Sequence, residues 1–386
     1  MKTFKYFFIF LFLLLTVVSC NQDPIFFNIS LEVEPVDPKI QGSISKMVKT
    51  SGGGASYKIY TANGSLWCFS GNSWNRISAP GRVFDVAITA NDAIFILCID
   101  DLYGTVYKQS GGNWVEIKNN SSYSLIQSIF AADNRLFAGA CKSESDELAI
   151  LELKPSDTFG QIRTDCRDLT GVAYYPLTAG DGIYYFSLTN GIYSAIDTGG
   201  VLGSVNPLTL SYIVKGIFSY EHSSTGPVSI IAVTNNANII SITVDDTDPA
   251  NPKSSYNVYS KKYPFTGAIA SWKSNTSSEE RILFGVRGGI DNYGYYEMKI
   301  LGTGKPDFNT FYEPGELKPD SSVDNIESYR QQLKKHLVNS LMQAPSSAGK
   351  TTVGQLPVVF AGTQKDGVWS YRETNEKPEG VWNAEE

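Results

Sequence analysis

Side chains that could perform acid–base or nucleophilic chemistry are scarce in this sequence. It contains only two histidines, of which His222 lies in a predicted turn and His336 at the start of a predicted strand. Neither belongs to a Ser/His/Asp or Cys/His arrangement with a recognisable spacing. The glycine-rich residues 51–54 join two predicted strands and lack the helix and lysine of a phosphate-binding loop. We therefore expect no catalytic site and no cofactor.

The densest group of carboxylates consists of Asp245, Asp246 and Asp248. Carboxylate oxygens are suitable ligands for Ca²⁺, so these three residues are the candidate metal ligands of the chain. Their order differs from that of an EF-hand loop, and Pro249 ends the group. Both features favour a solvated loop between two strands over a metal site.

The tryptophans are the remaining candidates for contact with a ligand. Trp272 lies at the end of a predicted strand, before the loop at 273–280. An exposed tryptophan at that place would be a contact residue, so Trp272 is the candidate ligand-binding residue. The other tryptophans recur at equivalent positions of an internal repeat, which favours packing: Trp67, Trp74, Trp114, Trp369 and Trp382.

Composition argues against one class of partner and favours one class of fold. The 386 residues include 32 basic and 39 acidic ones, a net charge of -7, without a long run of either sign. Proteins that bind nucleic acid usually present a basic face, so we expect no nucleic-acid partner. The 34 glycines, 22 tyrosines and 20 phenylalanines suit an all-β protein of many short strands.

An internal repeat indicates the elements that would position these residues. Residues 125–130 (Leu-Ile-Gln-Ser-Ile-Phe) and 136–140 (Leu-Phe-Ala-Gly-Ala) form a pair of apolar strands, and residues 337–342 and 358–362 form a similar pair. Turns such as Asn190-Gly191 then introduce a third strand. Seven such pairs occur, and their first strands begin at residues 44, 83, 125, 169, 213, 265 and 337.

A period of roughly 40 to 50 residues with four strands per unit is typical of β-propeller blades. We therefore predict an all-β fold over residues 41–386, a seven-bladed β-propeller with four-stranded antiparallel blades. The first two strands of each blade should be buried on both faces by neighbouring blades. Small residues in the first strands would let the blades converge near the ring axis: Ser128, Gly171, Gly216, Gly267 and Ser340.

The spacing between the first strands of the last two repeats, which begin at residues 265 and 337, is longer than the spacing between the others. Residues 323–335 place Ile326, Tyr329 and Leu333 at helical spacing, which predicts a short helical insertion there. One helix over residues 323–342 is the alternative. We reject it because residues 337–342 match the first strands of the other six repeats.

The N-terminus has the features of a processing signal. A basic start is followed by 13 nearly continuous apolar residues at 6–18, too few for a bilayer span of about 20 residues. The sequence Val17-Val18-Ser19-Cys20 resembles the bacterial lipoprotein signal. This resemblance implies cleavage before Cys20 and acylation of that residue with diacylglycerol and a further chain such as palmitate, which would anchor the protein in a membrane. The alternative is an ordinary secretory signal that ends at a chance cysteine.

The predicted organisation follows from this signal. Residues 1–19 would be the signal peptide, residues 20–40 a tether with an N-terminal strand, and residues 41–386 the propeller. The residue after Cys20 is not aspartate, which resembles the pattern for export to an outer membrane. We expect a lipid-anchored protein of the bacterial cell envelope, at the outer membrane or the cell surface.

Four further cysteines belong to the predicted propeller: Cys68, Cys98, Cys141 and Cys166. An exported chain could oxidise them. None has the CxxC spacing of a redox or metal site, and Cys98 falls inside an apolar strand. We favour free thiols in the core, with Cys141–Cys166 as the pairing if a disulfide forms.

The whole pattern resembles bacterial β-propeller lipoproteins, most clearly at residues 367–372 (Gly-Val-Trp-Ser-Tyr-Arg) and 380–383 (Gly-Val-Trp-Asn). The resemblance implies a non-enzymatic interaction scaffold with a protein or glycan ligand at one face or in the central channel. One alternative is an enzyme acting on extracellular glycans, which would need paired acidic residues at the channel mouth. A second alternative is an assembly subunit of an envelope complex.

Overall fold

The described residues all lie within one compact unit, Pro38–Glu386. The computed structural model describes residues 39–51, 57–70, 73–100, 103–119, 121–142, 145, 147–177, 180–221, 228–248, 251–273, 280–287, 294–301, 305–312, 333, 336–344, 357–372 and 381–385. No helix in this part of the chain has the length and apolar character needed to cross a bilayer.

The strands form seven antiparallel sheets in chain order, which we number as blades 1 to 7. Blades 1 to 3 consist of β1 (Met47–Lys49), β2 (Ile59–Ala62), β3 (Leu66–Ser70) and β4 (Ser73–Ile77); β5 (Val83–Ile88), β6 (Ile94–Asp100), β7 (Tyr103–Ser110) and β8 (Asn113–Glu116); and β9 (Leu125–Ala132), β10 (Arg135–Cys141), β11 (Leu148–Lys154) and β12 (Thr158–Cys166).

Blade 4 has a divided outer edge, because both β16 and β17 pair with β15. It consists of β13 (Leu169–Pro176), β14 (Gly182–Leu188), β15 (Gly191–Thr198), β16 (Val201–Leu202) and β17 (Asn206–Thr209). Blades 5 to 7 consist of β18 (Val214–Glu221), β19 (Val228–Thr234), β20 (Asn238–Asp245) and β21 (Lys253–Ser260); β22 (Phe265–Lys273), β23 (Glu280–Val286), β24 (Tyr295–Ile300) and β25 (Pro306–Tyr312); and β26 (Val338–Gln343), β27 (Pro357–Thr363), β28 (Val368–Arg372) and β29 (Val381–Ala384).

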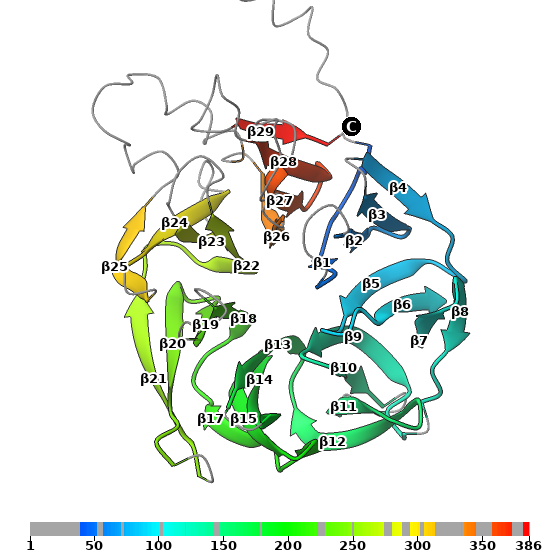
Figure 1. The fold of residues 1–386 in the computed structure, drawn as a ribbon, viewed down its shortest axis with the longest axis horizontal. Helices are drawn as coiled ribbons and strands as arrows, with labels where there is room; N and C mark the ends of the chain where they lie inside the picture. The colour runs from blue at the N-terminus through cyan, green and yellow to red at the C-terminus, as the bar shows by residue number, and fades with distance from the viewer. Residues whose placement is uncertain are drawn as a thin grey trace, which may run out of the picture. The chain divides into compact units, whose positions relative to one another are not determined.

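The seven blades stand in a closed ring, with the first strand of each blade nearest the axis (Figure 1). First strands of neighbouring blades contact one another all the way round, including β26 of blade 7 and β1 of blade 1. The predicted seven-bladed propeller is therefore confirmed. Residues 338–343 form strand β26, so the alternative of one helix over 323–342 is wrong. The predicted helical insertion at 323–335 lies, apart from Leu333, outside the described residues.

Burial follows the position of a strand within its blade. All seven residues of the second strand β14 are buried, because blades 3 and 5 cover both of its faces. The outermost strand β21 is mostly exposed. The first strands differ from the prediction of full burial, since β13 alternates between buried and half-buried residues. The reason is that one edge of each first strand faces the space on the ring axis.

A short segment before β1 completes the ring by pairing with blade 7. The Lys39 N–H donates to the Glu385 carbonyl over 2.7 Å, and the Ile44 N–H donates to the Thr363 carbonyl over 2.9 Å. Between them, Gly42 and Asp366 form a parallel β-bridge. The side chain of Ile44 is fully buried in the core shared by blades 7 and 1. Hydrogen bonds to blade 7 thus fix residues 39–44, which precede the first strand of blade 1.

All four cysteines of the propeller are buried thiols, as predicted. Cys141 in β10 and Cys166 in β12 both lie opposite Leu148, on either side of the intervening strand β11. Two strand spacings separate them, about 9.5 Å, whereas disulfide-bonded residues have Cα atoms within about 7 Å. Burial raises the pKa of the Cys166 thiol to about 11.

Candidate binding cavity on the ring axis

Six of the seven first strands share one irregularity near their beginning. In five of them a single residue has no partner on the second strand, so the register shifts by one. In β22 three residues, 266–268, lie opposite the single residue Gly285. A bulge of this kind turns the extra side chain out of the ladder. We call the five single extra residues the bulge ring: Phe84, Gln127, Thr170, Lys215 and Asn339.

Small residues in and beside these bulges lie where neighbouring blades approach closely. A Cβ atom added to Gly216 would lie 2.3 Å from the carbonyl oxygen of Gly267, and one added to Gly267 would lie 2.3 Å from that of Lys215. Gly267 also has a φ of +106°, which L side chains rarely adopt. The small residues predicted to let the blades converge therefore do so, most tightly between blades 5 and 6.

Hydroxyl groups at these positions connect the inner strands of successive blades. Ser340 of blade 7 accepts a hydrogen bond from the Met47 N–H of blade 1 over 2.9 Å. Thr266 of blade 6 donates to the Val338 carbonyl of blade 7 over 2.6 Å. First strands expose one backbone edge to the axis, and bonds of this kind satisfy part of that edge.

Lys46 and Asp85 occupy the corresponding positions of blades 1 and 2 and form an ion pair over 2.8 Å. Asp85 also accepts the Ile129 N–H of blade 3 over 3.0 Å, and Lys46 donates to the Ile129 carbonyl. The ammonium lies 4.1 Å from the centre of the Phe130 ring. One charged pair thus joins the inner strands of three blades.

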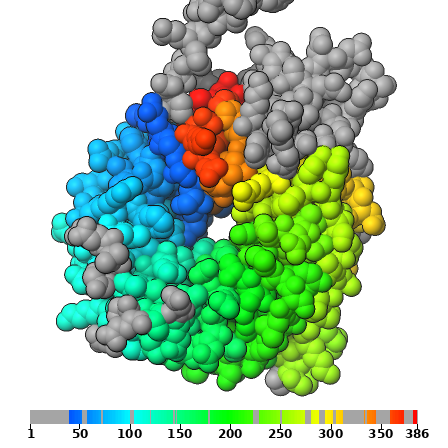
Figure 2. All heavy atoms as spheres, turned by 180° about the vertical axis from the view of Figure 1, so that it is seen from behind, coloured from blue at the N-terminus to red at the C-terminus, as the bar shows by residue number. Residues whose placement is uncertain are grey.

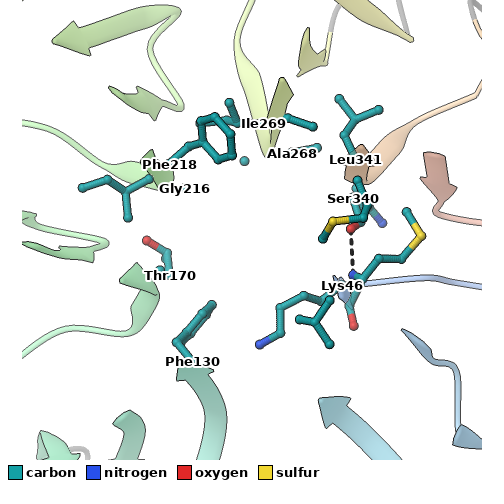
Figure 3. Close-up of a pocket in the computed structure, with 18 of the residues that line it drawn as sticks. Lys46, Phe130, Thr170, Gly216, Phe218, Ala268, Ile269, Ser340 and Leu341 are labelled. Carbon is teal, nitrogen blue, oxygen red and sulfur yellow. Dashed lines mark hydrogen bonds between the residues drawn. The ribbon is translucent and has the colours of Figure 1, made fainter. Parts of the chain in front are cut away.

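The first strands enclose a cavity of about 700 Å³ on the ring axis. The space-filling view shows the ring open at its centre (Figure 2). In the close-up, Lys46, Phe130, Thr170, Phe218 and Ser340 surround the opening, each from a different blade (Figure 3). The wall combines hydroxyl and amide groups with apolar side chains, a composition that ligand sites commonly have.

The charge of this wall is predominantly positive. Among the described lining residues there are three lysines, Lys46, Lys49 and Lys215, and a single carboxylate, that of Asp85. Lys49 is accessible to solvent within the channel and donates to the Gln343 carbonyl over 3.4 Å. Partial loss of hydration between the channel walls lowers the pKa of its ammonium.

The described lining residues contain one acidic side chain. Glycoside hydrolysis by the usual route needs two carboxyl groups, one as acid and one as base or nucleophile. Asp85 is the single carboxylate among these residues, and its two oxygens already accept bonds from Lys46, Val86 and Ile129. The lining residues that remain offer hydrogen bonds, positive charge and apolar contact.

Trp272 lies away from this cavity, in the interface between blades 6 and 7. The prediction of an exposed aromatic side chain is wrong, because the residue is only 5% exposed. Its ring lies 6.0 Å from that of Tyr371 and 5.2 Å from the guanidinium carbon of Arg281. A tryptophan at a strand end looked exposed in the sequence, but the neighbouring blade covers it.

The three aspartates predicted as candidate metal ligands are exposed where β20 ends. Asp245 accepts hydrogen bonds from the Thr247 hydroxyl over 2.7 Å and from the Thr247 N–H over 3.2 Å, and the pKa of its carboxyl is lowered by these bonds. Within the described ranges, which include Asp245, Asp246 and Asp248, no group of three or more metal-ligating residues is arranged to hold an ion. The three carboxylates are thus exposed at the end of β20, and that of Asp245 is bonded to Thr247.

The remaining predicted residues are not brought together. His336 approaches Asp366, with 2.7 Å between Nδ1 and Oδ2, and lies 4.9 Å from the Trp369 ring, away from the cavity wall. His222 and Cys20 lie outside the described residues.

The bulge ring was not predicted from the sequence, although a signal for it exists. In four of the five cases the bulged residue directly precedes a small residue, Ser128, Gly171, Gly216 or Ser340. A variable polar residue followed by a small one, at the start of each repeat, would have indicated the channel wall.

No protein-family model matches the chain, and no curated protein matches it. Solved structures do: YCF48 from Cyanidioschyzon merolae has a TM-score of 0.50 and 9% identity, covering 87% of this chain and 97% of that chain. YCF48 bound to D1 peptide has a TM-score of 0.49 and 12% identity over 87% and 95% of the two chains. The periplasmic gluconolactonase PpgL of Pseudomonas aeruginosa has a TM-score of 0.47 and 9% identity, covering 90% of this chain and 95% of that chain. At these identities the likeness is one of fold.

Proposed function

We propose that this protein is a non-enzymatic binding module that takes a protein segment or a glycan into the cavity on the ring axis. The observation that supports this proposal is the cavity itself, which has about 700 Å³ and is lined by all seven blades. Ligand sites typically have about 300 to 1,000 Å³ and combine apolar walls with a few polar groups. A closed ring holds these groups rigidly, which limits the entropy lost on binding.

Two features favour binding over catalysis. The single carboxylate among the described lining residues, Asp85, is held by Lys46 and two backbone N–H groups. Its two oxygens are therefore already engaged within the ring. The bulge ring, in contrast, places side chains outside the strand ladders on the cavity wall. Thr170 of this ring donates to the Ser187 and Val214 carbonyls and Gln127 donates to Cys141 Sγ, whereas Phe84 projects into solvent. Phe84 is 55% exposed although it is a large apolar residue.

The proposal is tested by closing the cavity while leaving the ladders intact. Gln127 and Asn339 have no partner in their ladders, so tryptophan at both positions would fill the cavity without breaking strand pairing. The matched control places tryptophan at Ser255 and Asn257, two exposed residues of the outermost strand β21. We expect affinity capture from native membranes, read by mass spectrometry and glycan analysis, to recover the ligand with the wild type and the control. The filled variant should recover at least tenfold less. Equal recovery by the filled variant would refute binding in the cavity.

We further propose that acyl chains on Cys20 hold the propeller at a bacterial envelope membrane, at the outer membrane or the cell surface. The motif Val17-Val18-Ser19-Cys20 after an apolar stretch supports this location. Two or more chains anchor stably, because each buried methylene contributes about 0.8 kcal/mol. Labelled palmitate should be incorporated into the wild type and not into Cys20→Ala. Incorporation that persists in Cys20→Ala would place the lipid elsewhere.

A further inference from the structure

The cavity has a charge opposite in sign to that of the whole chain. The chain has a net charge of -7. The described cavity wall has three lysines and one aspartate, a net of +2. A low-dielectric channel lined by one sign of charge focuses the field and attracts ligands of the opposite sign. The wall is therefore suited to a negatively charged ligand.

Two of the three lysines are available to such a ligand. Lys46 is neutralised by Asp85. Within the described residues, neither Lys49 nor Lys215 forms an ion pair, and Lys49 has a single long hydrogen bond to a carbonyl. Enclosure without a carboxylate partner disfavours the charged form of Lys49, and a bound anion would relieve that penalty.

The two available lysines lie near opposite ends of the inner strands. Lys215 is the bulged residue at the start of β18, whereas Lys49 is the last residue of β1. Lys49 lies three residues after Lys46, and Lys215 lies one residue before Gly216, which takes the place of Lys46 in blade 5. Lys49 is therefore four positions further along its strand than Lys215 is along β18. At about 3.3 Å per residue, the two positions are about 13 Å apart along the axis. An extended ligand would therefore meet both.

The wall between these two levels includes the partly exposed apolar side chains of Phe130, Val172, Phe218 and Met342 among hydroxyl groups. Figure 3 shows Phe130 and Phe218 at the edge of the opening. An acidic polysaccharide would present hydroxyl groups between its charges. A peptide strand presents apolar side chains there, which suits this wall better.

We propose that the cavity binds an extended acidic peptide segment, with carboxylates four residues apart near Lys215 and Lys49 and apolar side chains between them. The inference rests on the proposed function and names its ligand class. It requires charge at both ends of the segment and apolar contact in the middle.

The test uses the acylated full-length protein in detergent and fluorescently labelled, end-blocked pentapeptides. The acidic probe is Glu-Leu-Ser-Leu-Glu and the neutral probe is Gln-Leu-Ser-Leu-Gln; a galacturonate pentamer represents acidic glycans. We expect the acidic peptide to bind at least tenfold more tightly than the neutral one and the glycan. Lys49→Met and Lys215→Met should each weaken it by about fivefold, and higher salt should weaken it further. Lys253→Met, on the exposed outermost strand, should change nothing.

Equal affinity for the acidic and neutral peptides, or unchanged binding in both lysine variants, would overturn the inference. Tighter binding of the galacturonate pentamer would replace peptide by glycan as the ligand class. None of these outcomes affects the proposed function, which the tryptophan-filled variant tests separately. Unchanged thermal melting of the lysine variants would show that the affinity loss does not reflect unfolding.

Discussion

The ammonium of Lys46 lies 2.8 Å from a carboxylate oxygen of Asp85, 39 residues further along the chain. The two residues take equivalent places in blades 1 and 2, where five other blades have serine or glycine. Their side chains are 20% and 10% exposed, and both also bind the backbone of Ile129 in blade 3. The pair therefore joins three blades at the edge of the cavity.

Loss of the aspartate should destabilise the ring. Asp85→Ala leaves Lys46 without its counter-ion and the Ile129 N–H without its acceptor, and we expect a loss of about 2 to 4 kcal/mol in the free energy of unfolding. Urea denaturation measures it. Lys108→Met is the control, since its pair with Asp157 is exposed and should contribute less than about 1 kcal/mol. Equal effects of the two substitutions would contradict the bridging role of Asp85.

The close approach of blades 5 and 6 makes Gly267 sensitive to any side chain. Gly267→Ala combines an unfavourable φ with a Cβ 2.3 Å from a backbone oxygen, so it should destabilise the protein by more than about 3 kcal/mol. Gly200→Ala has a φ of +81° with open space around the Cβ, and should lose only about 1 kcal/mol. Thermal melting compares the two variants. Equal decreases in melting temperature would show that the contact between blades 5 and 6 does not add to the cost of the substitution at Gly267.

Trp272 should matter for stability and leave ligand binding unchanged. Trp272→Ala removes a buried ring from the core of blades 6 and 7, with an expected loss of about 3 to 5 kcal/mol. Trp272→Phe retains most of the packing and should fold. Its capture of the native ligand should equal that of the wild type. Weaker ligand capture by Trp272→Phe, at unchanged stability, would show that Trp272 contributes to ligand binding.

High pH should destabilise the propeller through its buried acids. Burial raises the pKa of Cys166 from 9.0 to about 11 and that of Tyr185 from 10.0 to about 12. The folded state therefore keeps protons that the unfolded state releases, and stability must fall as pH rises above about 9. We expect a loss on the order of 3 kcal/mol between pH 9 and pH 11.

Denaturation in urea at each pH, with absorbance of ionised tyrosine, measures this dependence. Tyr185→Phe removes one contributor and should flatten the curve above pH 10. Stability that stays constant from pH 9 to pH 11 would contradict the burial of these groups.

The ring was predictable because its signal is local and repeated. The second strands are apolar along their whole length and the turns after them carry residues such as Asn190-Gly191, so each blade is visible in the sequence. Residues 338–343 could be identified as a strand only by comparison with the other repeats.

The candidate site was not predictable in the same way. Whether Gln127 or Lys215 faces the axis depends on a register shift between two strands, which hydrophobic patterning does not report. The contact between Lys46 and Asp85 depends on how two blades are placed, and the burial of Trp272 depends on a side chain from the next blade. The Asp245 carboxylate, in contrast, is bonded locally, to Thr247 two residues further along the chain.

Binding on the ring axis is tested most directly by photo-crosslinking in intact cells. Benzoylphenylalanine would replace Phe218 in the cavity wall or, as a control, Tyr256 on the exposed outermost strand. A ligand in the cavity should give a discrete crosslinked species from position 218 and none from position 256. Crosslinks from position 256 alone would place the ligand on the outer rim and contradict binding on the axis.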